Sequence, residues 1–215
     1  MIAITNVDIH GWEAAIRGMR NTMNSWSRSD SEFVEVFGDI VDAKPTYLKT
    51  TSIGQQDLAL MTKLSSAGSE HAKYRRMITV YMDILAPLYW WKEFDTYKVG
   101  TVANSCSTMH KIAEKEFTMD DFSHEHMSLG IPSVLNVVVE SLNNCREMYN
   151  KTNDKQHWWN MIQLLPSSYN QKRTVMLNYE VLANIYHQRK EHKLDEWRDF
   201  CRWVETLPYS EIITG

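Results

Sequence analysis

Residues 71–109 read HAKYRRMITVYMDILAPLYWWKEFDTYKVGTVANSCSTM, and their pattern is the most informative in the chain. Over residues 78–84 apolar side chains alternate with polar ones, which predicts a half-buried strand. Pro87 suits the first turn of a helix that follows the strand. A loop of small and polar residues is then expected over residues 100–107. The stretch therefore predicts a strand, a short helix and a polar loop in succession.

Outside this stretch helices dominate. Residues 1–7 predict a strand and residues 28–54 predict loops. In the helix expected over residues 131–149, one face carries Val134, Leu135, Val138 and Leu142, and this face is expected to point inward. The expected helices cover residues 12–26, a short segment from Leu58 that ends near Gly68, 131–149, a segment after Asp154 that stops near Pro166, 176–190 and 194–204. Many helices with few strands predict an α+β fold, in a single domain over residues 1–215.

Composition excludes several classes of protein. The 215 residues include 43% hydrophobic and 23% charged side chains, and the formal net charge is −4. A nucleic-acid-binding protein usually has a basic face, so no nucleic-acid partner is expected. No apolar run is long enough to span a membrane. Three widely spaced cysteines form no disulfide framework, which favours a reducing, cytoplasmic location.

Two other features leave alternatives open. The pairs Trp90-Trp91 and Trp158-Trp159 predict core and oligomer-interface packing, or else a stacking wall for a planar ring. The cluster His124-Glu125-His126 is too compact for both imidazoles to reach one metal ion, so no metal site is expected. Motifs for dinucleotide loops, phosphate loops, zinc proteases and serine hydrolases are absent.

The opening stretch resembles the signature region of the flavin-dependent thymidylate synthases. In that family a His, a strand and an Ala-Pro pair precede a loop of the form RHRxxSxxExSxRY. His71 and Ala86-Pro87 take the first positions, and the loop then aligns without a gap. The family's loop residues correspond here to Thr96, Tyr97, Lys98, Thr101, Asn104, Cys106 and Thr108-Met109.

A second stretch supports the resemblance. Leu165-Pro166 is similar to a family Leu-Pro pair, and Asn178, Asn184 and Arg189 follow at the family's spacing. In the family the last of these, an Arg, holds the pyrimidine base. His192 and Trp197 stand one place early and one place late relative to their family counterparts. The resemblance implies a central antiparallel sheet flanked by helices.

Several family arginines are absent. Thr96, Thr108, Ile162 and Glu180 stand where the family has guanidinium groups that hold cofactor or nucleotide. Guanidinium groups bind phosphate by paired hydrogen bonds, so any FAD is expected to bind weakly. Lys98, Lys172 and Arg173 are expected to compensate in part, whereas Glu180 adds a repelling charge. The loop over residues 100–107 is interpreted either as a rewritten ligand site or as a segment that caps its own helix through Ser105 or Ser107.

The functional hypothesis is a divergent protein of this type that acts on a pyrimidine deoxynucleotide, in the simplest case by reductive methylation of dUMP. The alternatives are a nucleotide-binding homologue without flavin and a non-catalytic oligomeric binding protein. The resemblance implies FAD, and implies NADPH and methylene-tetrahydrofolate only if the family reaction is retained. It also implies a homotetramer.

The site residues expected from the resemblance fall into three groups. Cys106 and Arg189 are the catalytic candidates, and a thiolate at residue 106 would be a strong nucleophile. The cofactor side comprises His71, Thr96, Tyr97, Lys98, Asn178 and Asn184. The substrate side comprises Glu93, Thr101, Asn104, Ser105, Ser107, Thr108 and Arg189.

Overall fold

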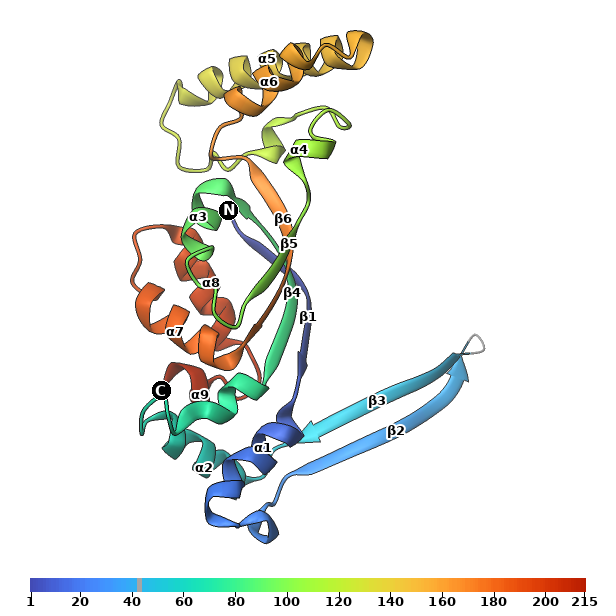
Figure 1. The fold of residues 1–215 in the computed structure, drawn as a ribbon. Helices are drawn as coiled ribbons and strands as arrows, with labels where there is room; N and C mark the ends of the chain where they lie inside the picture. Colours follow the sequence, from blue (N-terminus) through green and yellow to red (C-terminus); the bar gives the residue numbers. More distant parts are fainter. Residues whose placement is uncertain (42–43) are drawn as a thin grey trace.

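One antiparallel sheet organises the chain (Figure 1). The computed structural model describes the backbone of residues 1–41 and 44–215, and the side chains of residues 1–34 and 51–215. The strand order is β1-β4-β6-β5, with β1 at Ala3–His10, β4 at Thr79–Pro87, β6 at Asn170–Asn178 and β5 at Val102–Ser105. An α+β fold with an antiparallel sheet and helices is thereby confirmed.

The two faces of the sheet differ in burial. On β4, Val80, Met82 and Ile84 are buried, whereas Tyr81 and Leu85 are exposed. This alternation is the one that the sequence predicts for residues 78–84, and that prediction is confirmed. Helices lie against one face of the sheet, and no described helix covers the other face (Figure 1).

An aromatic core lies beneath the covered face. Trp90 stacks within 4.6 Å of Trp197 and 5.0 Å of Phe94, measured between ring centroids. The helices that surround this core are α1 (Trp12–Arg20), α2 (Gln55–Ser65), α3 (Leu88–Phe94), α7 (Tyr179–Arg189), α8 (Asp195–Glu205) and α9 (Glu211–Thr214). The pair Trp90-Trp91 is therefore core. The helix expected over residues 12–26 ends at Arg20 and continues as the 3-10 turns η1 (Asn21–Met23) and η2 (Trp26–Arg28).

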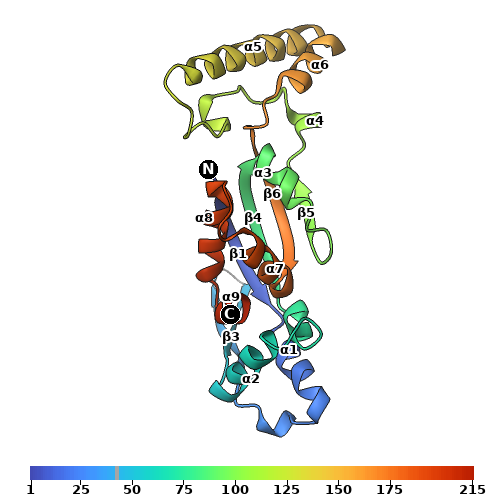
Figure 2. The ribbon, with the colours of Figure 1, turned by 90° about the vertical axis from the view of Figure 1, so that its left-hand side faces the viewer.

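A second, smaller core lies beyond one end of the sheet. Helices α5 (Ile131–Thr152) and α6 (Lys155–Leu164) pack together there (Figure 2), and Asp154 caps α6 by accepting from the Gln156 amide at 2.9 Å. Leu135 and Leu142 are buried, as predicted, but Val134 is 61% exposed. Its predicted inward position is wrong, because the inward stripe runs through Leu135, Val139 and Leu142.

Residues 28–54 contain a hairpin where loops were predicted. Strand β2 (Glu32–Val41) pairs with β3 (Lys44–Ser52) in antiparallel register, from Glu32 opposite Ser52 onward. The run FVEVF at 33–37 is β-branched and aromatic, which favours a strand. Residues 42–43 of the predicted loop lie outside the described residues. The hairpin projects away from the main sheet (Figure 1).

Two further predictions are corrected by the sheet. The loop expected over 100–107 contains β5, an edge strand that pairs from Val102 opposite Met176 to Ser105 opposite Arg173. The helix expected from residue 176 begins at Tyr179, because residues 170–178 form β6 between β4 and β5. Within the described part of the chain, no helix is both long and apolar enough to cross a membrane.

Candidate functional site

Arg189, the last residue of α7, lies in an aromatic and acidic setting. Its Nε donates to the hydroxyl of Tyr97 at 2.8 Å, and its Nη1 donates to Glu93 Oε2 at 2.8 Å. The guanidinium carbon lies 4.9 Å from the ring centre of Trp197 and 5.7 Å from that of Tyr97. Cation–π contacts and a charge-assisted hydrogen bond therefore fix the guanidinium in one orientation.

Glu93, on α3, joins three elements at this point. Its Oε2 accepts from Trp197 Nε1 at 3.0 Å and lies 3.4 Å from Nε2 of His192. Its Oε1 has no hydrogen-bond partner among the described residues. The pair of Glu93 and Arg189 is partly buried, so the carboxylate and the guanidinium compensate each other's charge where water access is limited.

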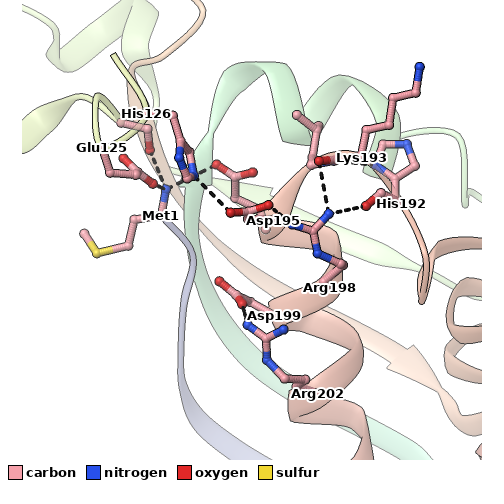
Figure 3. Close-up of polar contacts among 12 residues, drawn as sticks. Met1, Glu125, His126, His192, Lys193, Asp195, Arg198, Asp199 and Arg202 are labelled. Carbon is pink, nitrogen blue, oxygen red and sulfur yellow. Dashed lines mark hydrogen bonds and ion pairs between the residues drawn. The ribbon is translucent and has the colours of Figure 1, made fainter. Parts of the chain in front are cut away.

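Arg198 on α8 holds the segment that carries His192. As Figure 3 shows, its Nη1 donates to the carbonyls of His192 and Lys193, and its Nη2 pairs with Asp195. Arg198 thus holds the turn between α7 and α8, in which the His192 imidazole lies beside Glu93.

The expected cofactor positions on the signature segment differ in exposure. Tyr97 is buried, and its hydroxyl also donates to Gln188 Oε1 at 2.9 Å. Lys98 is exposed, and Thr96 donates its hydroxyl hydrogen to the Glu93 carbonyl at 2.7 Å. Tyr97 therefore belongs to the Arg189 cluster, which comprises Arg189, Glu93, Tyr97, Trp197 and His192. Its buried ring leaves little surface on which a flavin could stack.

The rest of this segment runs along an exposed sheet edge. Asn104 and Ser105 lie on β5 and are exposed, as is Cys106. Gly100 has φ +79°, and a Cβ there would lie 2.9 Å from Asn178 Nδ2, so the close approach needs a glycine. The hydroxyl of Thr101 is buried and has no hydrogen-bond partner among the described residues.

A one-turn helix follows. Ser107 is the N-cap of α4 (Thr108–Lys111), and its Oγ accepts from the His110 amide at 3.1 Å. The capping alternative is confirmed for Ser107, while Ser105 belongs to β5. The role of Cys106 as a nucleophile stays a prediction.

Two asparagines of the second stretch make local contacts. Asn178 caps α7 by accepting from the Val181 amide at 3.0 Å. Asn184 is exposed, and its Oδ1 accepts from Gln188 Nε2 at 2.7 Å. In the single chain, both side chains thus support the helix that ends in Arg189.

Charged side chains near the expected cofactor positions are paired. Glu180 forms an ion pair with Arg75 at 2.7 Å, so its charge is compensated, contrary to the repelling charge expected from the sequence. Lys172 pairs with Asp83 at 2.9 Å, and Arg173 pairs with Asp95 at 2.7 Å. These pairings were missed because they join positions far apart in sequence.

His71 stands apart from the Arg189 cluster. It is exposed and lines a cavity of about 840 Å³ between α1, α2 and η3 (Ala72–Met77). The other residues of the cavity wall come from three separate segments, at residues 18–28, 56–64 and 70–77, and no pattern in the sequence predicts that these segments meet.

The cluster at residues 124–126 is held in polar contacts near the N-terminus. Glu125 pairs with the amine of Met1, and His126 Nε2 lies 3.1 Å from Asp195 Oδ2 (Figure 3). The amine also lies 3.2 Å from Glu196 Oε1. Among the described residues, no group of three or more His, Cys, Asp or Glu side chains has a metal-binding arrangement.

The fold is shared with known enzymes. One structure of the flavin-dependent thymidylate synthase ThyX from Helicobacter pylori, complexed with FAD and dUMP, matches with a TM-score of 0.66 at 16% identity. The match covers 98% of this chain and 97% of that chain. A second ThyX structure from the same organism, with FAD and dUMP, matches with a TM-score of 0.70 at 14% identity, over 100% and 97% of the two chains.

This chain has a ThyX-like fold. The likeness extends over nearly its whole length, and it therefore includes both stretches that carry the sequence resemblance. No protein-family model matches the sequence, and no curated protein sequence matches it.

Proposed function

We propose that this chain is a divergent protein of the flavin-dependent thymidylate synthase type that binds a pyrimidine deoxynucleotide at Arg189. The observation that carries the proposal is the fixed guanidinium between Tyr97, Trp197 and Glu93. Its position in a ThyX-like fold, whose neighbours are complexed with dUMP, supports the choice of ligand. The simplest reaction is the reductive methylation of dUMP to dTMP.

The chemistry of the cluster suits the edge of a base. Arg189 uses Nε and one hydrogen of Nη1 within the chain, and its Nη2 donates to no described residue. Glu93 Oε1 likewise accepts nothing from the described residues. A pyrimidine presents N–H and carbonyl groups side by side, so it can meet an open donor and an open acceptor together. Compensation by Glu93 makes Arg189 better suited to a neutral base than to a doubly charged phosphate.

The residues around the expected FAD positions fit the cofactor weakly. FAD, when bound, would carry the reducing equivalents, and NADPH and methylene-tetrahydrofolate would be needed only if the family reaction is retained. Lys98 is an exposed cation without an ion-pair partner among the described residues. Lys172 and Arg173 would first have to leave Asp83 and Asp95. Among the expected cofactor positions, Lys98 thus supplies the one lysine or arginine charge for two phosphates.

Protein purified without added flavin is therefore expected to be largely colourless. Each charge-assisted hydrogen bond lost from a phosphate weakens binding by about 1.5–3 kcal/mol, and about 1.4 kcal/mol is one decade in affinity. An absorption spectrum after gel filtration, followed by titration with FAD and with dUMP, measures this. Stoichiometric FAD that survives gel filtration would contradict weak binding. Failure of both ligands to bind would contradict the proposed function.

The proposal includes a homo-oligomer, with a tetramer as the family resemblance implies. Support comes from the uncovered sheet face, with Tyr81 and Leu85, and from exposed apolar residues on α5, among them Val134 and Val137. Exposed apolar side chains that gather on one surface are typical of association sites between protein chains. Sedimentation equilibrium is expected to give a mass four times that of the 25.2 kDa chain. A monomer at micromolar concentration would contradict the assembly.

A second candidate is a nucleotide-binding homologue that holds no flavin. The observation in its favour is the loss of guanidinium groups at Thr96 and Glu180. Colourless protein that binds dUMP but not added FAD would favour it. A non-catalytic oligomeric binding protein would bind neither ligand and would still associate. The cytoplasmic location stays a prediction.

A further inference from the structure

The wall of the cavity beside His71 has an apolar part and a polar part. Methionine and leucine side chains form the apolar part, with Met19, Met23, Met77, Leu60 and Leu64. Hydroxyl, amide and charged side chains form the rest. Its volume of about 840 Å³ lies within the range typical of small-molecule and cofactor sites. Methionine is adaptable and polarisable, which suits it to contact with a flat ring.

Positive charge converges on the polar part of this cavity. Arg28 from η2 and Lys73 from η3 both line it, and both are exposed. Neither forms an ion pair or a side-chain hydrogen bond with any described residue. Glu70 also lines the cavity and opposes part of this charge. Two cations without a partner among the described residues therefore line one cavity, in a chain whose net charge is −4.

A third cation lies in the same wall. Arg20 is 4% exposed, and its Nε donates to Asp57 at 2.6 Å while its Nη1 donates to the Ser25 carbonyl at 3.2 Å. Its Nη2 has no hydrogen-bond partner among the described residues. Arg20 also lines the cavity.

The segment that carries Arg28 is held rigidly. Asp57 is fully buried and accepts from the hydroxyls of Ser29 and Ser31, each at 2.7 Å. Asp30 in turn caps α2 by accepting from the Gln56 amide at 2.9 Å. A cation on a fixed loop loses less conformational entropy on binding than one on a mobile loop.

We infer that Arg28 and Lys73 form a phosphate-binding pair in this cavity and supply charge to the pyrophosphate of the flavin cofactor. The identity of the ligand rests on the proposed function. The pair would supply charged donors to phosphate in a chain where Thr96 and Glu180, outside the cavity wall, stand in place of family arginines. The apolar part of the wall would contact the ring system of the flavin, and Arg20 would add a hydrogen-bond donor.

FAD and riboflavin titrations, followed by flavin fluorescence, test this assignment. Riboflavin has the same ring but no phosphate. The double variant Arg28→Ala/Lys73→Ala is expected to bind FAD at least tenfold more weakly, and riboflavin with less than about a twofold change. Raising the salt concentration should weaken FAD binding more in the wild type than in the variant, because screening acts on the removed charges.

The matched control is Arg17→Ala/Lys63→Ala, which removes one Arg and one Lys from α1 and α2 outside the cavity. This control is expected to bind FAD as the wild type does. An unchanged FAD affinity in the Arg28/Lys73 variant, or an equal loss for riboflavin, would overturn the inference. A wild type that binds dUMP but not FAD would overturn it too, and would leave nucleotide binding at Arg189 standing. Failure to bind either ligand would overturn both.

Discussion

Replacement of Asp57 by alanine is expected to lower the free energy of unfolding by about 3–5 kcal/mol. Asp57 is fully buried and pairs with Arg20 at 2.6 Å, and Arg20 itself is buried. Removing the carboxylate leaves a buried guanidinium without its counter-ion. It also removes the acceptor that organises Ser29 and Ser31. The loss is large beside the roughly 5–15 kcal/mol that stabilises a typical domain.

Urea unfolding at pH 7, followed by circular dichroism, measures this change. The control is Asp8→Ala, because the Asp8 carboxylate is well exposed and contacts only His10 among the described residues. The control is expected to stay within about 0.5 kcal/mol of the wild type. Equal stability of the Asp57 and Asp8 variants would show that the buried pair does not hold α1, α2 and the loop between them together.

The same variant alters the response to acid. Burial raises the pKa of Asp57, but hydrogen bonds from Ser29, Ser31 and Arg20 outweigh it, and the pKa lies below its usual value of 3.8. A depressed pKa in the folded state gives stability that is present above the unfolded value and is lost as pH falls through the folded value. Below about pH 4 the wild type should therefore lose a contribution that Asp57→Ala already lacks.

Local pattern was enough to predict several elements. The alternation of residues 78–84 predicted β4, Asp154 predicted the start of α6, and the helix expected over residues 194–204 corresponds to α8. In each case one face is buried or one side chain caps a helix, so the signal lies within a few neighbouring residues.

Other elements depend on partners distant in sequence. Strand β5 is an exposed edge whose residues, VANS, have neither alternation nor strong strand preference, and it forms by pairing with β6. The start of α7 was placed early because residues 176–178 continue an apolar pattern into the end of β6. The hairpin of β2 and β3 was missed because its charged and polar residues resemble a loop.

The candidate site shows the same division. The resemblance pointed to Arg189, Tyr97 and Glu93, and the structure brings all three together. It did not predict that Trp197 and His192 would contact Glu93, since that needs α3, α7 and α8 to meet. Of the two cations at the cavity, Arg28 lies outside both stretches of resemblance, and Lys73 lies in the first stretch at a position to which the resemblance assigns no role.

The second large effect concerns Arg189 itself. Replacement of Arg189 by alanine is expected to weaken dUMP binding by about 2–5 kcal/mol, or roughly thirtyfold or more. The variant loses the ligand's donor and leaves Glu93 partly buried without its partner. Arg189→Lys keeps the charge but not the planar fork, so it should recover only part of the affinity. Lys190→Ala, at the exposed next residue, is the control and is expected to bind normally.

Nucleotide binding at Arg189 is tested by calorimetric titration of dUMP into the wild type and into Arg189→Ala, with folding checked by circular dichroism. We expect saturable binding by the wild type and by Lys190→Ala, and a loss of roughly thirtyfold or more in Arg189→Ala. Wild-type protein that binds dUMP with the same affinity as folded Arg189→Ala would contradict it.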